Sequence, residues 1–320
     1  MKFIELGRRF RDITEEELGN PELLFSFGES VLDSTTDDWK KLLESRRVVL
    51  LAEAGSGKTE EMKAQARRLK EEEGKYAFYA DLAPLDHQSL LDSLSADDEQ
   101  AFTTWKSEHD IPAWFFLDSV DELKLTQGKL KRAVNRFAKG VYEQLDRVYV
   151  IISCRPSDWK FDLDLEAVKN TLPIHYAEVP PVDLTGEELF LAPLRRDDEK
   201  QEKVSDEETN EVRTVIMLPL TPGQIKTYAH SCGAEDVEAF IEEIQQQEAW
   251  LFANRPLDCE NLVRIWNDRK ELGTRPQQHE ANITAKLKDD SERPDNNLLS
   301  NEKARAGAER LALALALTRT

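Results

Sequence analysis

Residues 52–59 have the types and spacing of a loop that binds phosphate groups. They read Ala52, Glu53, Ala54, Gly55, Ser56, Gly57, Lys58 and Thr59, which fits the pattern G-x-x-x-x-G-K-[ST] with Ala52 in place of its first glycine. Glycines let the backbone fold tightly, so that its N–H groups converge on phosphate oxygens. Lys58 would reach the β- and γ-phosphates, and the Thr59 hydroxyl would bind Mg²⁺. The segment therefore predicts a site for ATP or ADP with Mg²⁺.

A second group of residues has the chemistry to hold the metal and direct water. Asp118 ends the apolar run 114–118, and Asp121 and Glu122 follow three and four residues later. A carboxylate at the carboxyl end of a parallel strand lies at the edge where such sheets bind ligands. We expect Asp118 to hold Mg²⁺, through water, and Asp121 or Glu122 to orient or deprotonate the attacking water. The alternative is that these acids only cap the next helix.

Arg155 is the third candidate. It follows the apolar run 148–153, so a strand would deliver its guanidinium to the same edge of the sheet. There it could sense or stabilise the γ-phosphate. The alternative is an arginine paired with surface acids.

The elements that must position these residues alternate between strands and helices. Apolar runs predict strands at residues 48–52, 76–82, 113–118, 148–153, 174–179 and 212–218, and helical patterns cover residues 58–74 and 129–145. Such alternation predicts an α/β fold: a P-loop NTPase parallel sheet flanked by helices, followed by an all-helical domain. Because a strand precedes the phosphate loop and a helix follows it, an unrelated Gly-Ser turn is a poor alternative. The Arg155 strand would lie between those of the phosphate loop and Asp118, as in ATPases with an additional central strand.

The chain divides into three predicted parts. Residues 1–45 are a polar lead-in, residues 46–220 the NTPase domain with a charged insertion at 195–211, and residues 221–320 a helical domain. Thr221, Pro222 and Gln224 form a helix start signal, and Gly233 a stop. The last helix, from about Ser300, ends on Leu-Ala repeats without a stop signal, so we expect the native chain to continue and the helical domain to be truncated.

Three motifs together resemble the NACHT family, a group of STAND signal-transduction ATPases. They are Glu53-Ala54-Gly55-Ser56-Gly57-Lys58-Thr59, Leu117-Asp118-Ser119-Val120-Asp121-Glu122 and Ile152-Ser153-Cys154-Arg155-Pro156. Residues 218–221 with Gln224, Ile225 and Tyr228 look like the family's entry into its helical domain. Residues 253–257 look like the motif whose proline, here Pro256, packs beside the nucleotide, although an ordinary helix stop would also place a proline there.

The resemblance implies a switch in which exchange of ADP for ATP controls self-association and signalling, with a role in defence, in response to an unknown trigger ligand. Two departures from the family pattern are Ala52 and the pair Glu60 and Glu61, which puts carboxylates in the first helical turn, near the phosphates. We therefore expect slow hydrolysis.

Three alternative functions are considered. An AAA+-like ATPase that remodels a protein or nucleic acid would use the same site with continuous turnover. A metabolic kinase would need a lid with arginines, for which Arg195 and Arg196 are the only adjacent pair in the acidic insertion. A degenerate nucleotide-binding scaffold conflicts with the intact site residues.

Composition limits the partners. The net charge is −20 and no Lys/Arg run is long enough to follow a phosphate backbone, which disfavours nucleic acid as a direct partner. Three widely spaced cysteines without a C-x-x-C pattern indicate reduced thiols rather than a zinc site. No segment resembles a signal peptide or a membrane span. We expect a cytoplasmic protein without a membrane contact.

Overall fold

The computed structural model describes residues 3–14, 17, 36–118, 120, 129–174, 212–273, 277, 280, 283–284 and 300–318. The chain divides into two compact units, Met1–Leu218 and Pro219–Thr320. The predicted boundary between residues 220 and 221 lies two residues further along. Among the described residues, none of the helices has the length and apolar character that crossing a bilayer requires.

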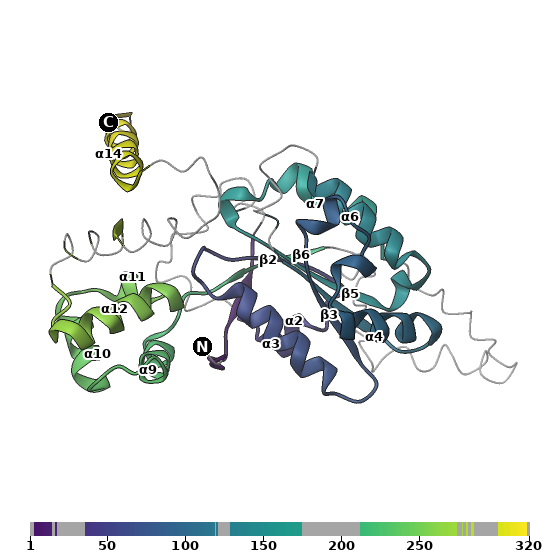
Figure 1. Cartoon of the computed structure of the whole chain (residues 1–320), viewed down its shortest axis with the longest axis horizontal. Helices are drawn as coiled ribbons and strands as arrows, with labels where there is room; N and C mark the ends of the chain where they lie inside the picture. The colour runs from purple at the N-terminus through teal and green to yellow at the C-terminus, as the bar shows by residue number, and fades with distance from the viewer. Residues whose placement is uncertain are drawn as a thin grey trace, which may run out of the picture. The chain divides into compact units, whose positions relative to one another are not determined.

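The described strands of the first unit form a six-stranded sheet in the order β1-β6-β2-β5-β4-β3 (Figure 1). These are β1 (Phe10–Asp12), β2 (Arg47–Leu51), β3 (Tyr76–Asp81), β4 (Ala113–Asp118), β5 (Val148–Cys154) and β6 (Arg213–Met217). All neighbouring pairs are parallel except β1 and β6. The predicted fold class is confirmed, and β5 lies between β2 and β4 as predicted.

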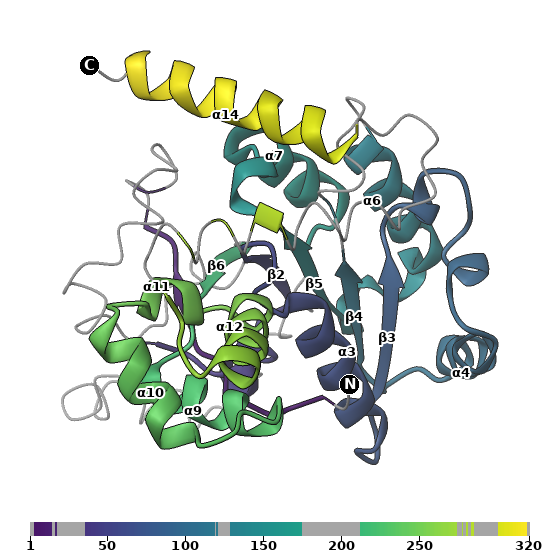
Figure 2. The same cartoon turned by 60° about the vertical axis from the view of Figure 1, so that its left-hand side comes forward.

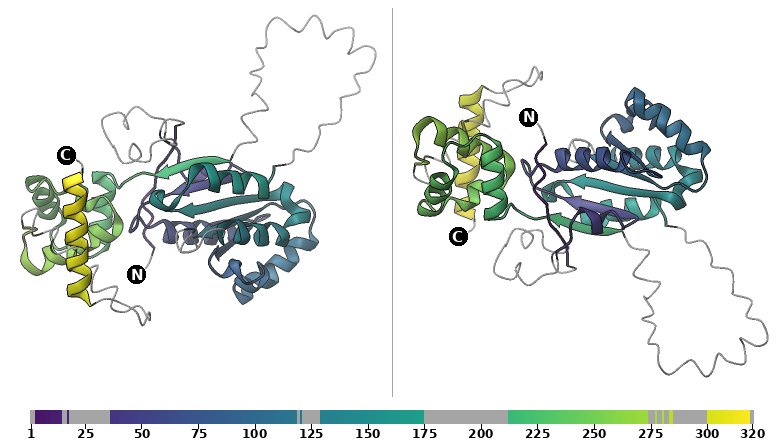
Figure 3. Two further views of the ribbon diagram at one scale, coloured as in Figure 1. Left: turned by 90° about the horizontal axis from the view of Figure 1, so that it is seen from above. Right: turned by 90° about the horizontal axis from the view of Figure 1, so that it is seen from below.

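Helices cover both faces of this sheet (Figure 3). One face packs against α2 (Trp39–Leu42) and α3 (Lys58–Lys70), and the other against α4 (Ala96–Ser107), α6 (Lys129–Gly140) and α7 (Phe161–Thr171). In β2, Val48 and Leu50 belong to the core on the α3 side, whereas Val49 and Leu51 belong to the core on the α6 side. Side chains alternate along a strand, so a strand buried on both faces needs apolar residues throughout.

The strands that carry the predicted site residues end at one edge of the sheet. Leu51 of β2 pairs with Cys154 of β5, and Leu117 of β4 pairs with Ile152 of β5. The phosphate loop follows β2, Asp118 ends β4 and Arg155 follows β5, so the parallel register alone brings all three to the carboxyl edge.

Short 3₁₀ helices shape the connections of this unit. They are η3 (Pro84–Asp86) and η4 (Leu91–Ser93) between β3 and α4, η5 (Tyr142–Arg147) after α6, and η6 (Pro156–Asp158) after β5. The helix predicted at 129–145 is therefore wrong in its last turn, because α6 ends at Gly140 and the chain tightens into η5. The helix predicted at 58–74 ends early as well, at Lys70, before Gly74 adopts a left-handed conformation with φ of 75°.

Two predicted segments fall mostly outside the described residues. Of the strand predicted at 174–179, only Ile174 is described, and it belongs to no strand. The charged insertion predicted at 195–211 lies wholly outside them. Helices α4 and α7 were not predicted.

The lead-in predicted at residues 1–45 contributes directly to the sheet. β1 pairs with β6 through Phe10 and Met217, and Phe10 also forms a bridge with Asp37. The Phe10 side chain is fully buried, and its ring meets that of Trp39 edge-on at 4.8 Å between centroids. The described part of this segment is thus an edge of the first unit rather than a separate tail.

The second unit is helical. It contains α9 (Pro222–Ser231), α10 (Val237–Gln246), α11 (Trp250–Ala253) and α12 (Pro256–Arg269), which Figure 2 shows gathered together, and α14 (Asn301–Thr318). The predicted capping box forms: the Thr221 hydroxyl accepts from Gln224 N, and the Gln224 side chain accepts from Thr221 N at 2.9 Å. Gly233 follows α9 with φ of 80°, as a helix stop should.

Candidate nucleotide site

The phosphate loop turns on two glycines in the left-handed region. Gly55 has φ of 76° and Gly57 has φ of 86°, conformations that a side chain would strain. Between them, Ser56 N donates to Glu53 O at 3.2 Å, which closes the turn. Helix α3 begins at Lys58, immediately after Gly57. The first N–H groups of a helix have no partner within it and carry partial positive charge, so this turn presents the donors that an anion needs.

Thr59 and Asp118 meet at the start of α3. The Thr59 hydroxyl donates to Asp118 Oδ2 at 2.6 Å, and the buried hydroxyl of Ser153 donates to Asp118 Oδ1. Asp118 itself is fully buried, and an isolated buried carboxylate would be costly. Hydroxyl and carboxylate oxygens are the hard ligands that Mg²⁺ takes. These side chains therefore fit a magnesium ion bound together with a nucleotide, as the sequence predicts.

Tyr79 is a member of this site that sequence reasoning missed. Its hydroxyl lies 3.0 Å from Asp118 Oδ2 and 2.9 Å from Asp81 Oδ1, and Lys63 Nζ lies 5.0 Å from the centroid of its ring. Burial and the two carboxylates raise the pKa of Tyr79, so it remains a neutral hydroxyl that can donate. The signal was available in part, since Tyr79 stands two residues before Asp81 in a predicted strand.

Arg8 is a second missed residue, and it reaches the phosphate loop from the N-terminal segment. Its guanidinium donates to Ser56 O at 2.9 Å and to Leu218 O at 2.8 Å. The side chain is only 2% exposed, and burial lowers the pKa of Arg8 to about 10, so it stays charged at neutral pH. Arg8 thus ties the loop to the end of β6. No local sequence pattern marks such a contact.

Ser56 also presents a polar atom without a partner. Its Oγ is buried and makes no hydrogen bond to any of the residues that the structure describes. A buried hydroxyl is normally satisfied, so an unpaired one beside the phosphate-binding turn fits a loop that hydrogen-bonds a bound group.

The two acids after Thr59 separate in the structure. Glu60 is exposed, whereas Glu61 is buried and accepts a hydrogen bond from Trp39 Nε1 at 2.9 Å. Burial raises the pKa of Glu61, against the opposing effects of Trp39 and Arg8. Glu61 therefore serves the packing between α2 and α3.

Of the remaining predicted site residues, the structure describes Arg155 and Pro256. Arg155 follows β5, is exposed and precedes η6. Asp121 and Glu122 lie outside the described residues. Pro256 is the first residue of α12 in the second unit, after Arg255 as the N-cap. The catalytic, nucleotide-binding and metal-binding roles of all these residues stay predictions.

Comparison with solved structures finds matches at low identity and low TM-score. The ORC1 protein of Aeropyrum pernix in complex with DNA is 14% identical, with a TM-score of 0.40, over 89% of this chain and 72% of that one. A Walker-type ATPase of Pyrococcus abyssi is 11% identical, with a TM-score of 0.43, over 87% and 74%. Drosophila ORC bound to DNA is 12% identical, with a TM-score of 0.32, over 84% and 58%. No protein-family model and no curated protein matches the chain.

The class of fold follows from the chain's own topology. Three features define a P-loop NTPase fold. The parallel strands have the order β6-β2-β5-β4-β3, a glycine turn joins β2 to α3, and a buried aspartate at the end of β4 lies beside Thr59. Within that class, the NACHT subtype rests on the sequence motifs alone.

Proposed function

We propose that this chain is an ATP-binding and ATP-hydrolysing molecular switch of the NACHT/STAND type, in which exchange of ADP for ATP controls self-association and signalling in defence. The observation that carries the ATPase part is the 2.6 Å hydrogen bond from Thr59 to the buried Asp118, set beside the phosphate turn. Thr59 and Asp118 would hold Mg²⁺, and the ion would neutralise phosphate charge.

Each of the other predicted site residues has a separate proposed role. Lys58 is to bind the β- and γ-phosphates, and Glu122, assisted or replaced by Asp121, is to orient or deprotonate the attacking water. Arg155 follows β5, the strand between β2 and β4, and is proposed to sense the γ-phosphate. Pro256 is proposed to pack beside the bound nucleotide.

A switch differs from a continuously cycling ATPase because, without a trigger, nearly all of its molecules occupy one closed conformation. In a switch, the trigger must bind the open form better than the closed form, because a ligand shifts an equilibrium only by its differential affinity. Without a trigger, the unsubstituted protein is therefore expected to retain ADP, turn over ATP slowly and stay unassembled. A variant that binds ATP without hydrolysing it is expected to assemble without the trigger.

The test measures nucleotide content, turnover and mass on one preparation. Purified protein is denatured and its nucleotide is identified by chromatography. Steady-state hydrolysis of the folded protein is followed with Mg²⁺-ATP. The mass of the Glu122→Gln variant is measured by light scattering, once with ADP and once with ATP. Retained ADP, slow turnover and assembly only with ATP support the switch. Rapid turnover without any trigger would instead favour the AAA+-like remodelling ATPase.

A further inference from the structure

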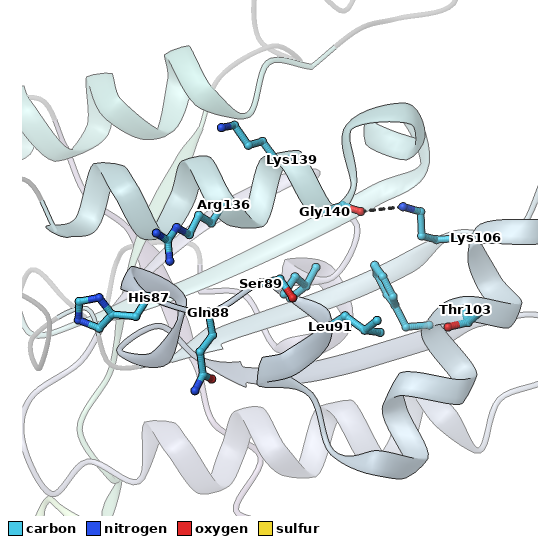
Figure 4. A pocket seen from close by; sticks show the side chains of 11 residues that line it. His87, Gln88, Ser89, Leu91, Thr103, Lys106, Arg136, Lys139 and Gly140 are labelled. Atoms are coloured by element: carbon cyan, nitrogen blue, oxygen red, sulfur yellow. Dashed lines mark hydrogen bonds between the residues drawn. The ribbon is translucent and has the colours of Figure 1, made fainter.

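A cavity of about 580 Å³ opens in the first unit, away from the phosphate-loop residues. It is bounded by the segment from His87 to Leu91, by α4 and by the last turns of α6 (Figure 4). Pockets that bury small organic ligands typically enclose about 300–1,000 Å³. The size therefore suits a ligand of roughly nucleotide dimensions.

The lining of this cavity has the opposite charge to the protein. Lys106, Arg136 and Lys139 line it together with His87, and no aspartate or glutamate is among its lining residues. The whole chain has 63 acidic against 43 basic residues. A cationic hollow on a protein of net charge −20 concentrates the field that attracts an anion.

The cations of the cavity are available to a ligand. Arg136 and Lys139 form no ion pair with any residue in the described ranges, and Figure 4 shows Arg136 extending from α6 toward the segment of His87 and Gln88. Lys106 Nζ donates to Gly140 O at 3.1 Å, which holds it at the rim and leaves further N–H donors.

The two acids beside the segment from His87 to Leu91 contact groups other than Lys106, Arg136 and Lys139. Asp86 is buried outside the lining, and Arg132 Nε donates to its Oδ1 at 2.8 Å. His87 Nε2 lies 3.5 Å from Asp86 Oδ2, and Asp92 accepts from the Ser89 hydroxyl at 2.6 Å. Both acids are thus engaged by their own neighbours.

The remaining wall is apolar. Phe102 and Leu90 are 4% and 1% exposed and back the cavity, while Leu91 is 39% exposed at its side. Lys106 Nζ lies 5.8 Å from the centroid of the Phe102 ring. Cationic donors beside an apolar wall match a molecule that carries a phosphate group and an apolar or aromatic part.

We propose that this cavity, lined by Lys106, Arg136 and Lys139, is a second ligand site that binds a small organic phosphate with an aromatic or apolar group. It is distinct from the phosphate loop and does not depend on the proposed switch. Arginine supplies fork-like donors for phosphate oxygens, and the lysines add point charges.

The test uses 1-naphthyl phosphate, a fluorescent aromatic phosphate, with protein carrying Lys58→Ala so that the phosphate loop does not compete. The probe is expected to bind saturably, inorganic phosphate to displace it only weakly, and 1-naphthol not to bind. No saturable binding at millimolar probe, or equal binding of 1-naphthol, would overturn the proposal.

A matched pair of variants locates the site. Arg136→Gln with Lys139→Gln is expected to weaken probe binding at least about 10-fold, because two charge-assisted contacts are lost. Lys131→Gln with Lys160→Gln removes the same charge at exposed positions outside the lining and is expected to change binding less than about twofold. Equal weakening in both pairs would overturn the proposal.

If the first pair fails to fold by circular dichroism, Thr103→Trp serves in its place. It fills the cavity from an exposed position on α4 and is expected to abolish saturable binding. Unchanged binding in a folded Thr103→Trp protein would contradict the site.

Discussion

Substituting Arg8 by methionine tests whether the N-terminal segment supports the phosphate loop. Methionine keeps the apolar stem and removes the guanidinium, so the change isolates the two hydrogen bonds to Ser56 O and Leu218 O, at 2.9 and 2.8 Å. Arg8→Met leaves both carbonyls without that donor and Glu61 without a nearby positive charge.

The magnitude follows from two opposing contributions. A hydrogen bond from a charged group contributes about 1.5–3 kcal/mol, so the two bonds to Arg8 contribute about 3–6 kcal/mol to the free energy of unfolding. Against this, burial lowers the pKa of Arg8 from 12.5 to about 10, and at about 1.4 kcal/mol per unit the substitution relieves about 3 kcal/mol of desolvation. The net loss therefore lies between about 0 and 3 kcal/mol, and its central value of about 1.5 kcal/mol corresponds to a fall of about 3–6 °C in Tm for a unit of this size.

The assay is differential scanning calorimetry of the full chain, with Arg9→Met as the matched control. Arg9 is exposed, and its side chain hydrogen-bonds only Thr36 among the described residues, so loss of that side chain is expected to change stability by less than about 0.5 kcal/mol. Affinity for Mg²⁺-ATP is expected to fall in Arg8→Met and not in Arg9→Met. If the two variants lose the same stability and bind nucleotide alike, Arg8 does not support the loop.

Three further predictions concern catalysis, metal binding and thiol chemistry. Glu122→Gln is expected to leave ATP binding intact and slow single-turnover hydrolysis about 100-fold, as loss of a general base does; an unchanged rate would remove this role. Tyr79→Phe removes a hydroxyl at 3.0 Å from Asp118 and is expected to raise the Mg²⁺ concentration needed for nucleotide binding about 2–10-fold, with Tm nearly unchanged; an identical Mg²⁺ titration would contradict this. Iodoacetamide at mildly alkaline pH is expected to modify Cys232 before Cys259 in the folded protein. Cys259 is buried and burial raises its pKa to about 12, so its thiolate fraction is lower than that of the half-buried Cys232. Peptide mass spectrometry that shows the reverse order would contradict the packing around Cys259.

The central strands could be predicted because their burial leaves an unmistakable pattern. A strand covered on both faces must be apolar at every position, as Val48, Val49 and Leu50 are, and turn residues follow it where it meets the ligand edge. The phosphate loop could be predicted for a related reason, since tight backbone turns at Gly55 and Gly57 need residues without a side chain.

Other parts leave no such pattern. β1 has only three residues, Phe10–Asp12, and takes its place through pairing with β6, about two hundred residues away in the chain. Arg8 belongs to the site because two distant backbone carbonyls accept from it, and neither the carbonyls nor their positions appear in local sequence. Tyr79 required knowing which face of β3 meets Asp118, which depends on the register between β3 and β4.

The apolar spacing of residues 129–145 predicts where α6 begins but not where it ends. The pattern of residues 129–145 stays apolar at helical spacing through Leu145, yet α6 ends at Gly140 and η5 continues with a tighter winding. Glycine in a helix costs about 1 kcal/mol relative to alanine, which favours a break there over a continuous helix. Gly140 also lies close to Leu90, where an added Cβ would come within 3.0 Å of Leu90 Cβ.

Isothermal titration calorimetry of Mg²⁺-ATP into the protein and its Lys58→Ala variant tests the central claim most directly. Binding of Mg²⁺-ATP to the unsubstituted protein is expected to give saturable heat. The contacts expected to produce it come from the backbone donors of residues 53–59, from Lys58 and from the pair Thr59 and Asp118. Loss of charge-assisted contacts to two phosphates in Lys58→Ala is expected to weaken binding at least about 100-fold. Absence of heat for a folded unsubstituted protein, or equal affinity in the variant, would contradict the phosphate-loop site.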